Sequence, residues 1–349
     1  MSHTEFTSAE LHALDEASSR PRFLLFPVLA VSGYVGFVCR LGGDGLAVQT
    51  AWILFVGYCC FCVGGVLHET VHQTLGSRRW ANVWGGRLVG TLLFIPYSVY
   101  RETHIRHHAY MNTPEDWELW PYACPRASLL FRRVFAWFDI FGAALSAPII
   151  YGRIYFSQNS PLNRQARATI TREYLAMAAF WGVGAIVVTG LAMLNVVELR
   201  RFDPVWLLPL PVAGAFNTLR KFTEHLGMAS YDPIQGTRTV IGSNWITRWC
   251  SYFNFELFVH GPHHRFPRAP HNQLSARLNE YLRQRPDTVV PLFSTYLAAL
   301  FDMLPCLVRN PGIGVNVGGQ VQYRHQRGVE NFASEVDVPM TSDESRQVA

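Results

Sequence analysis

Charged side chains are scarce in this chain of 349 residues. Only 16% of its residues are Asp, Glu, Lys or Arg, whereas average soluble domains carry about 25%. Hydrophobic residues make up 49% and are gathered into long runs. The length alone would allow two soluble domains. Long uncharged runs with so few charges instead predict one integral membrane domain.

A basic leader and a cysteine framework are missing as well. The first apolar run follows residues 1–22, which are polar and include four acidic residues, unlike the basic start of a cleavable signal peptide. We therefore expect this run to be an anchor that stays in the protein. Three of the seven cysteines, Cys59, Cys60 and Cys62, lie inside one apolar run, where they act as small apolar residues.

Four apolar runs are candidate transmembrane helices. They cover residues 23–41, 46–67, 174–194 and 204–219. Because a helix needs about 20 apolar residues to cross the hydrocarbon core, the first three are long enough. The fourth is short and holds three prolines, so we expect it to be kinked or extended by its neighbours. Short loops, 42–45 and 195–203, join the runs pairwise into two helical hairpins.

Charged residues interrupt three further apolar stretches, 83–100, 129–151 and 289–305, which we interpret as interfacial or re-entrant helices. The predicted fold is therefore an all-α integral membrane protein with four transmembrane helices in two hairpins, interfacial helices and a cap that carries the histidines. We expect three parts: residues 1–22 form a polar N-terminal arm, residues 23–310 the membrane domain with its cap, and residues 311–349 an exposed tail.

The arginines favour one orientation. Two hairpins place residues 1–22, residues 68–172 and the chain after Lys221 on the same side, where most arginines near span ends lie. The positive-inside rule makes that side cytoplasmic, although Arg200 and Arg201 in the second short loop run against it. The net charge of +5 fits a basic face that meets anionic lipid headgroups or an acidic redox partner. Because the arginines flank membrane segments, nucleic acid is not an expected partner.

Nine histidines fall into three short blocks and one outlier. They are His68 and His72 in HETVH; His104, His107 and His108 in HIRHH; His260, His263 and His264 in HGPHH; and His225 in TEHLG. Neutral imidazole is the commonest protein ligand of borderline transition metals. A structural zinc closes with four ligands, so nine histidines indicate two metals. Two irons with four or five ligands each account for the number and favour redox chemistry with dioxygen.

The spacing within the blocks is helical. His68 and His72 are four residues apart, as are His104 and His108, so each pair lies on one face of a helix. In the third block a Gly-Pro pair follows His260. Because proline suits the start of a helix, we expect His263 and His264 to open a helix, with His260 just before it.

Two other interpretations of these residues stay open. HETVH is also an HExxH sequence, which is typical of zinc hydrolases that use the glutamate, here Glu69, as the general base. A non-catalytic metal carrier is the second alternative. Carriers place polar ligands inside their spans at the bilayer midplane, whereas these histidines lie at or beyond the span ends, which favours an enzyme.

The three blocks resemble the histidine boxes of the membrane fatty acid desaturase and hydroxylase superfamily. HGPHHRFPRAPHNQL is similar to that family's third box and its continuation, HIRHHAYMNTPEDWE to its second box, and His225 in RKFTEHLG to its lone extra ligand histidine. The resemblance covers about residues 45–275. One departure is Lys221, which stands where acyl-CoA desaturases of this type have an asparagine.

The resemblance implies a non-haem di-iron enzyme that uses dioxygen on a fatty acyl or other lipid hydrocarbon chain. Electrons would come from a separate donor of ferredoxin or cytochrome b5 type on the cytoplasmic face, because no H-P-G-G stretch of a fused haem domain is present. Introduction of a double bond is the expected reaction. Hydroxylation, ketolation and oxidative decarboxylation to an alkene stay open on the same boxes.

Some neighbouring residues are candidates for supporting roles. Asp116 and Glu224 could orient ligating imidazoles from outside the ligand set, although Glu224 could instead pair with Arg220, one turn earlier. Five aromatic residues are candidates for the lining of a substrate tunnel, namely Trp52, Phe55, Tyr97, Trp117 and Trp120. Ordinary packing or an interface anchor is the favoured alternative for each of them.

Overall fold

The computed structural model describes residues 8–76, 78–194, 203–269 and 271–320, with side chains from residue 22 onward. The described chain is almost wholly helical. The helices are α1 (Ser8–Val38), α2 (Leu46–Val71), α3 (Arg79–Leu92), α4 (Tyr97–Tyr110), α5 (Leu129–Phe141), α6 (Ala143–Phe156), α7 (Arg164–Met193), α8 (Pro209–His225), α9 (Trp245–Phe253), α10 (His260–Arg265), α11 (Leu274–Gln284) and α12 (Tyr296–Arg309). Short 3-10 helices cover Pro204–Leu207, His271–Gln273 and Gly314–Val317.

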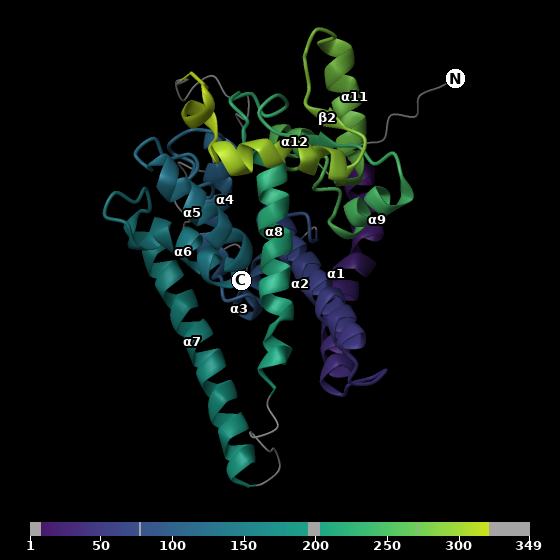
Figure 1. The fold of residues 1–349 in the computed structure, drawn as a ribbon, viewed down its shortest axis with the longest axis vertical. Coiled ribbons are helices and arrows are strands. Elements are labelled where there is room, and N and C mark those ends of the chain that lie inside the picture. The colour runs from purple at the N-terminus through teal and green to yellow at the C-terminus, as the bar shows by residue number, and fades with distance from the viewer. Residues whose placement is uncertain (1–7, 77, 195–202, 270, 321–349) are drawn as a thin grey trace.

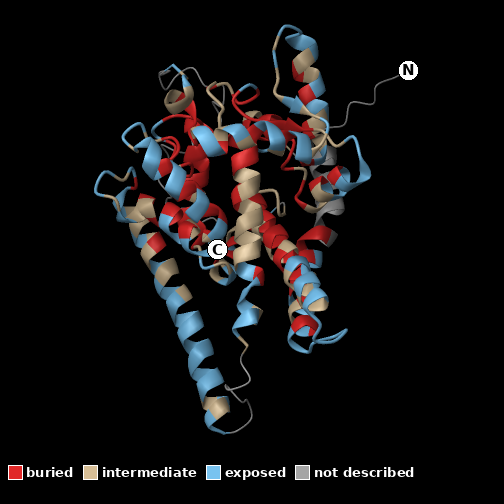
Figure 2. Ribbon diagram, viewed as in Figure 1, coloured by how far each residue is buried: buried red, intermediate tan, exposed pale blue. Residues whose placement is uncertain are grey.

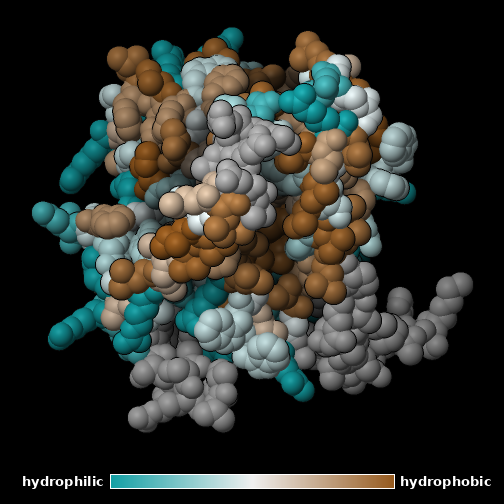
Figure 3. Space-filling model, turned by 90° about the horizontal axis from the view of Figure 1, so that it is seen from below, coloured by the Kyte–Doolittle hydropathy of each residue, from teal (hydrophilic) through white to brown (hydrophobic). Residues whose placement is uncertain are grey.

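Long helices form the lower part of the molecule, and shorter helices form a cap above them (Figure 1). The strands β1 (Thr239–Val240) and β2 (Leu292–Phe293) make one short parallel pair in the cap. Buried residues concentrate where the cap meets the long helices, whereas the lower half of α7 is exposed (Figure 2). From below, apolar side chains gather over the middle of the lower face (Figure 3). This distribution fits a membrane protein whose core lies beneath its cap.

Among the described residues, two helices are long and apolar enough to cross a membrane, α2 and α7. The pair α5 and α6 together would form a third, although the chain bends by 119° between them. The apolar part of α1, Arg22–Val38, is shorter. The prediction of a helical membrane fold is thus confirmed, but the four complete spans are not.

The fourth expected span differs for a physical reason. Pro204 opens a short 3-10 helix and Pro209 opens α8, because proline lacks an N–H and suits a first helical position. The run is therefore divided at Leu208, as its prolines led us to expect. Beyond this break α8 continues without interruption into the cap as far as His225.

Helical or packed structure continues across two of the expected boundaries. Helix α1 begins at Ser8 and runs through residue 22, so the N-terminal arm is not separate from the first apolar run. At the other end, residues 311–314 are buried, and the Ile313 N–H donates to the carbonyl of Tyr122. Ile313 is buried because it is apolar and completes a core cluster with Tyr122 and Phe222. The packed chain thus extends past residue 310, while residues 195–202 and 321–349 lie outside the described parts.

A buried ion pair fixes α8 against the bent pair α5 and α6. Nζ of Lys221 lies 2.8 Å from Oδ2 of Asp139. The hydroxyls of Tyr122, Ser146 and Thr218 also donate to the Asp139 carboxylate. Lys221 therefore uses its charge to join helices. This contact gives Lys221 a structural role.

We predict that Lys221→Met destabilises the fold by about 3–5 kcal/mol, because it leaves the Asp139 carboxylate buried without its cation. The double variant Lys221→Met/Asp139→Asn removes both charges and should recover most of that loss. Thermal unfolding in detergent measures both effects. Equal losses of stability in the single and double variants would show that the pair does not hold these helices.

Candidate metal centre

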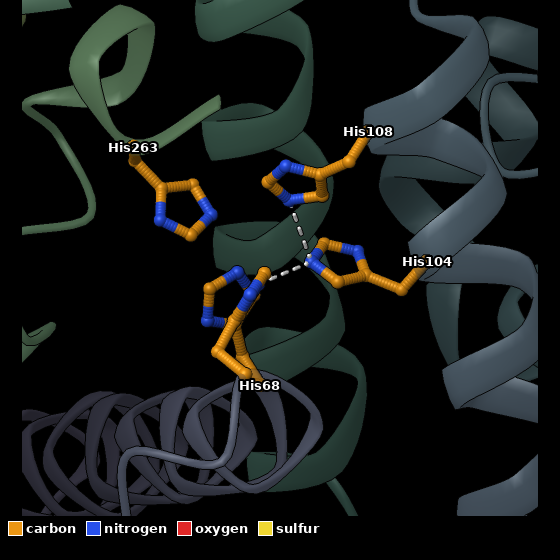
Figure 4. A group of neighbouring side chains, drawn as sticks. His68, His104, His108 and His263 are labelled. Atoms are coloured by element: carbon orange, nitrogen blue, oxygen red, sulfur yellow. Dashed lines mark hydrogen bonds between the residues drawn. The ribbon is translucent and has the colours of Figure 1, made fainter. Parts of the chain in front are cut away.

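All nine predicted histidines lie in two buried clusters. The ligand nitrogens within each cluster are all within 4.8 Å of one another. One cluster has five members, His68, His72, His104, His108 and His263. The other has four, His107, His225, His260 and His264. Figure 4 shows rings of the five-membered cluster pointing toward one another: His68 from α2, His104 and His108 from α4, and His263 from α10.

Helix geometry explains how each block is divided between the clusters. Residues four apart lie on the same face of a helix, whereas adjacent residues differ in direction by about 100°. His104 and His108 accordingly share one cluster, but His107 belongs to the other. The adjacent pair His263 and His264 is divided in the same way. Both clusters therefore draw ligands from α4 and from α10, and they lie side by side.

The third block differs from its prediction in one detail. His260 is the first residue of α10 and does not precede the helix. Pro262 then occupies the third position, where no intrahelical partner exists for a backbone N–H. Proline there costs the helix no hydrogen bond. As a result His260 and His264 are one turn apart and point into the same cluster.

Outward contacts fix the tautomers of several rings. Nδ1 of His260 lies 3.1 Å from the carbonyl oxygen of Leu257, which can only accept a hydrogen bond. Nδ1 therefore carries the proton, and Nε2 presents a bare lone pair to the cluster. Burial, followed by the charge of Arg220, lowers the pKa of His260 well below its ordinary value. The ring is therefore neutral, which is the form that binds metals.

Inward nitrogens approach one another closely. Nε2 of His260 lies 2.8 Å from Nε2 of His225 and 3.0 Å from Nε2 of His264. In the other cluster Nε2 of His104 lies 3.1 Å from Nε2 of His72. Nε2 of His263 is buried without a hydrogen bond. Converging lone pairs repel unless a cation lies between them, so the donor set fits a metal ion at each cluster.

Two carboxylates hold histidines of α4 from outside. Oδ2 of Asp116 lies 2.8 Å from Nδ1 of His107, and Oε2 of Glu118 lies 2.7 Å from Nδ1 of His104. The other oxygen of Glu118 accepts from the Tyr151 hydroxyl at 3.2 Å. Asp116 is where sequence reasoning expected it, but Glu118 was missed. The signal for Glu118 was its position two residues after Asp116, in the same turn-rich segment.

Glu224 pairs with Arg220, one of the two contacts expected for it, and it also lies beside a ligand histidine. Its Oε2 lies 3.5 Å from the inward nitrogen, Nε2, of His260 and 3.9 Å from Nε of Arg220. Burial raises the pKa of Glu224 to about 8, although Arg220 acts in the opposite direction. The carboxylate thus lies beside the metal-facing side of the four-membered cluster, while the outward nitrogen of His260 is held by a backbone carbonyl.

A second carboxylate network supports the five-membered cluster. Oε1 of Glu69 lies 3.2 Å from Nδ1 of His68, and Oε2 lies 3.4 Å from Nδ1 of His271. His271 in turn contacts the guanidinium of Arg22 at 2.6 Å. Glu69 therefore contacts Nδ1 of His68, as the outer carboxylates do in α4. Sequence reasoning missed His271, which stands outside the paired blocks.

Helix α4 depends on a carboxylate from α7. Its N-cap residue is Pro96, which makes no side-chain cap. Glu173 takes that role: it accepts from the backbone N–H and the hydroxyl of Ser98, both at 2.7 Å. Nε of Arg87 also donates to Glu173, at 2.9 Å. A negative group at a helix N-terminus is stabilising, so Glu173 steadies the helix that carries three of the histidines.

The aromatic tunnel candidates pack in other ways. Trp117 and Trp120 flank the guanidinium of Arg153, with their rings 5.1 and 4.1 Å from it. The indole N–H of Trp52 donates to the carbonyl of Leu41. Trp52 is near the start of α2, about 24 Å from His68 along the helix axis at about 1.5 Å per residue. Phe55 contacts Trp52 there. Tyr97 is buried beneath α3, and its ring limits the space beside Gly86.

Comparison with known proteins adds two findings. Residues 45–296 match the family model for fatty acid desaturase, a range that includes all nine histidines. An sn-1 acyl-lipid omega-3 desaturase (ferredoxin) from Synechocystis sp. is 24% identical over 298 residues, which cover 76% of this chain and 74% of that protein.

We predict that Asp116→Asn and Glu118→Gln weaken different metal sites. Each removes the anionic partner of one histidine, and such losses reduce metal affinity roughly 10–100-fold. Asp116→Asn should deplete the cluster of His107, and Glu118→Gln the cluster of His104. Metal content at limiting iron, with Mössbauer spectra to distinguish the sites, measures this, and the exposed Glu115→Gln is the control. The same spectral component lost in both variants would contradict the division.

Proposed function

This chain belongs to the fatty acid desaturase family and is an enzyme of desaturase type, and from that premise we propose an oxygen-dependent di-iron lipid desaturase. In this proposal the enzyme introduces a carbon–carbon double bond into an acyl chain. The observation that carries it is the division of nine buried histidines into groups of five and four. Five and four imidazoles suit two transition metals, and they exceed what a single closed zinc site uses.

The histidines would hold one iron in each cluster. Bound iron would supply the activation of dioxygen that is needed to remove hydrogen from an unactivated methylene, which acid–base side chains alone do not achieve. The protein's own contribution is orientation. Asp116, Glu118 and the Leu257 carbonyl fix the rings of His107, His104 and His260 respectively. Burial of all nine rings excludes water from the site.

A lipid chain is the substrate that the surroundings favour. The site lies beneath the cap, at the ends of helices with long apolar surfaces. The Synechocystis relative is named for action on an acyl lipid at the omega-3 position. For this chain we propose a fatty acyl chain carried by a membrane lipid as the substrate class.

The electron donor is proposed to be a separate protein that docks on the cytoplasmic face of the cap. The relative's name includes ferredoxin, which supports a small iron–sulfur donor over a fused haem domain. The proposal includes a multi-pass protein whose histidine blocks, and the basic residues beside them, face the cytoplasm. A positively charged face also favours an acidic partner.

The geometry around Glu69 argues against a zinc hydrolase. A general base of that class must face the metal and its water, whereas Glu69 contacts Nδ1 of His68 and the hydroxyl of Thr74. Hydroxylation, ketolation and oxidative decarboxylation use the same ligand set. The product, and not the ligands, distinguishes them from desaturation.

We predict that protein purified without oxygen and loaded with iron binds two irons per chain. Given dioxygen, reductant and membrane lipids, it should form products that lack two hydrogens, as detected by mass spectrometry. Apoprotein and oxygen-free reactions are the controls. Products heavier by one oxygen would replace the desaturase by a hydroxylase on the same site. One zinc per chain with no oxygen consumption would overturn the proposal.

We also predict that Glu69→Gln keeps activity when iron is in excess, because glutamine still offers an oxygen to Nδ1 of His68. His264→Ala should remain inactive under the same conditions, since it removes a ligand from the four-membered cluster. Oxygen consumption and product formation at several iron concentrations test the pair. Collapse of activity in Glu69→Gln at saturating iron, with His264→Ala active, would favour the hydrolase.

A further inference from the structure

An apolar groove lies between α7, a candidate span, and the end of α6. Its volume is about 580 Å³, within the range of about 300–1,000 Å³ that is usual for ligand pockets. The walls include Tyr155 and Phe156 of α6, and Tyr174 and Ala178 of α7. Trp181 closes one end: its ring stacks on Phe94 at 4.6 Å.

Three polar groups of the lining already have hydrogen-bond partners. The Tyr155 hydroxyl and the Thr171 hydroxyl bond each other at 2.7 Å. The indole N–H of Trp181 donates to the carbonyl of Thr91 at 3.0 Å. A polar ligand would gain few new hydrogen bonds here and would lose those it makes to water. The groove therefore favours a hydrocarbon chain.

The length of the groove fits one leaflet of a bilayer. Helix α7 is a candidate span, and most of its length stands apart from the other helices (Figure 1). From Thr171 to Trp181 the helix rises about 15 Å, at about 1.5 Å per residue. The hydrocarbon core is about 30 Å thick, so this segment covers about half of it.

Two cations stand at the polar end of the same face. Arg167 is one turn before Thr171, and Arg164 is nearly two turns before it. Arg167 donates to the carbonyls of Tyr155 and Ser157, which hold its guanidinium beside the groove without cancelling its charge. Arg164 is exposed. Neither arginine forms an ion pair within the described residues, and the first turn of α7 has no acidic residue.

We propose that this groove binds an anionic phospholipid of the bilayer. One acyl chain would lie along α7 between Tyr155 and Trp181, and the phosphate would meet Arg164 and Arg167. Apolar contact and charge complementarity together select a two-part ligand of this kind. The proposal does not depend on the metal chemistry or on conversion of the bound lipid.

Such a lipid would contact the part of α7 that supports α4. Glu173, which caps α4 through Ser98, lies between Arg172 and the groove residue Tyr174. Because only Ala166 and Ile170 of α7 are buried, few protein contacts hold the helix in place. A bound lipid would add contacts at the point where α7 reaches the helix of the second histidine block.

Ala178→Trp tests the groove because it fills the space without adding charge. The matched control is Ala176→Trp, at the same depth and on the opposite face of α7. The whole protein is purified in mild detergent and titrated with phosphatidylglycerol, phosphatidylcholine or oleate, and retained lipid is counted by native mass spectrometry. We expect wild type and Ala176→Trp to retain one phosphatidylglycerol, and Ala178→Trp to bind it at least about tenfold more weakly.

Arg164→Glu tests the headgroup and decides the matter if Ala178→Trp does not fold. It should weaken phosphatidylglycerol binding about tenfold, whereas Arg172→Glu, away from the groove, should not. Retention in both Ala178→Trp and Arg164→Glu equal to wild type would overturn the proposal. Oleate binding as tightly as phosphatidylglycerol would also overturn it, in favour of a free fatty acid, as would equal binding of phosphatidylcholine. The readout is lipid retention, so failure of the proposed catalytic function leaves this test intact.

Discussion

Repulsion between inward-facing imidazole nitrogens is the constraint on which the structure depends. Nitrogens only 2.8 to 3.2 Å apart, such as those of His225 and His260 or of His104 and His108, are not a stable apolar core. They can be held there because the outer nitrogens of His260, His107 and His104 are tied to fixed acceptors and the surrounding helices are anchored independently. Many of the hydrogen bonds and ion pairs around the site therefore lie on the outer side of the histidines, where Asp116, Glu118 and Glu69 are located.

The anchoring of those helices uses charge placed at positions that are otherwise apolar. Glu173 caps α4 from another helix, and Lys221 joins α8 to the bend between α5 and α6. The carboxylates of Glu173 and Asp139 are each satisfied by several partners, which is the condition for burying them at tolerable cost. Both contacts join helices that are distant in sequence.

The sequence revealed the ligands but not all of their supports. Paired histidines at helical spacing marked nine residues that the fold brings into two clusters, because such spacing determines which side chains share a face. Glu118 and His271 were missed because their partners are 14 or more residues away, so these contacts depend on the fold. The position of Glu118 two residues after Asp116 was a weak local signal. Glu224 was identified, but its side of the ring depends on the rotation of α8, which spacing does not determine.

The extent of the packed region also depends on contacts between residues that are distant in sequence. Hydropathy located α2 and α7, but the end of the packed region depended on Ile313, whose burial against Tyr122 is a tertiary event. The apolar run at residues 204–219 was recognised, yet its prolines decide where a helix can start. The division of each adjacent histidine pair between two clusters follows from the helix repeat, because adjacent residues point in directions about 100° apart.

Because adjacent histidines belong to different clusters, the single helix α10 positions ligands of both clusters. It has six residues, and a single peptide bond joins His263 of one cluster to His264 of the other. Any rotation or slide that improves the fit of one ring displaces the other by a similar amount. The positions of His263 and His264 are therefore coupled. A change in the spacing within this short helix would alter both clusters.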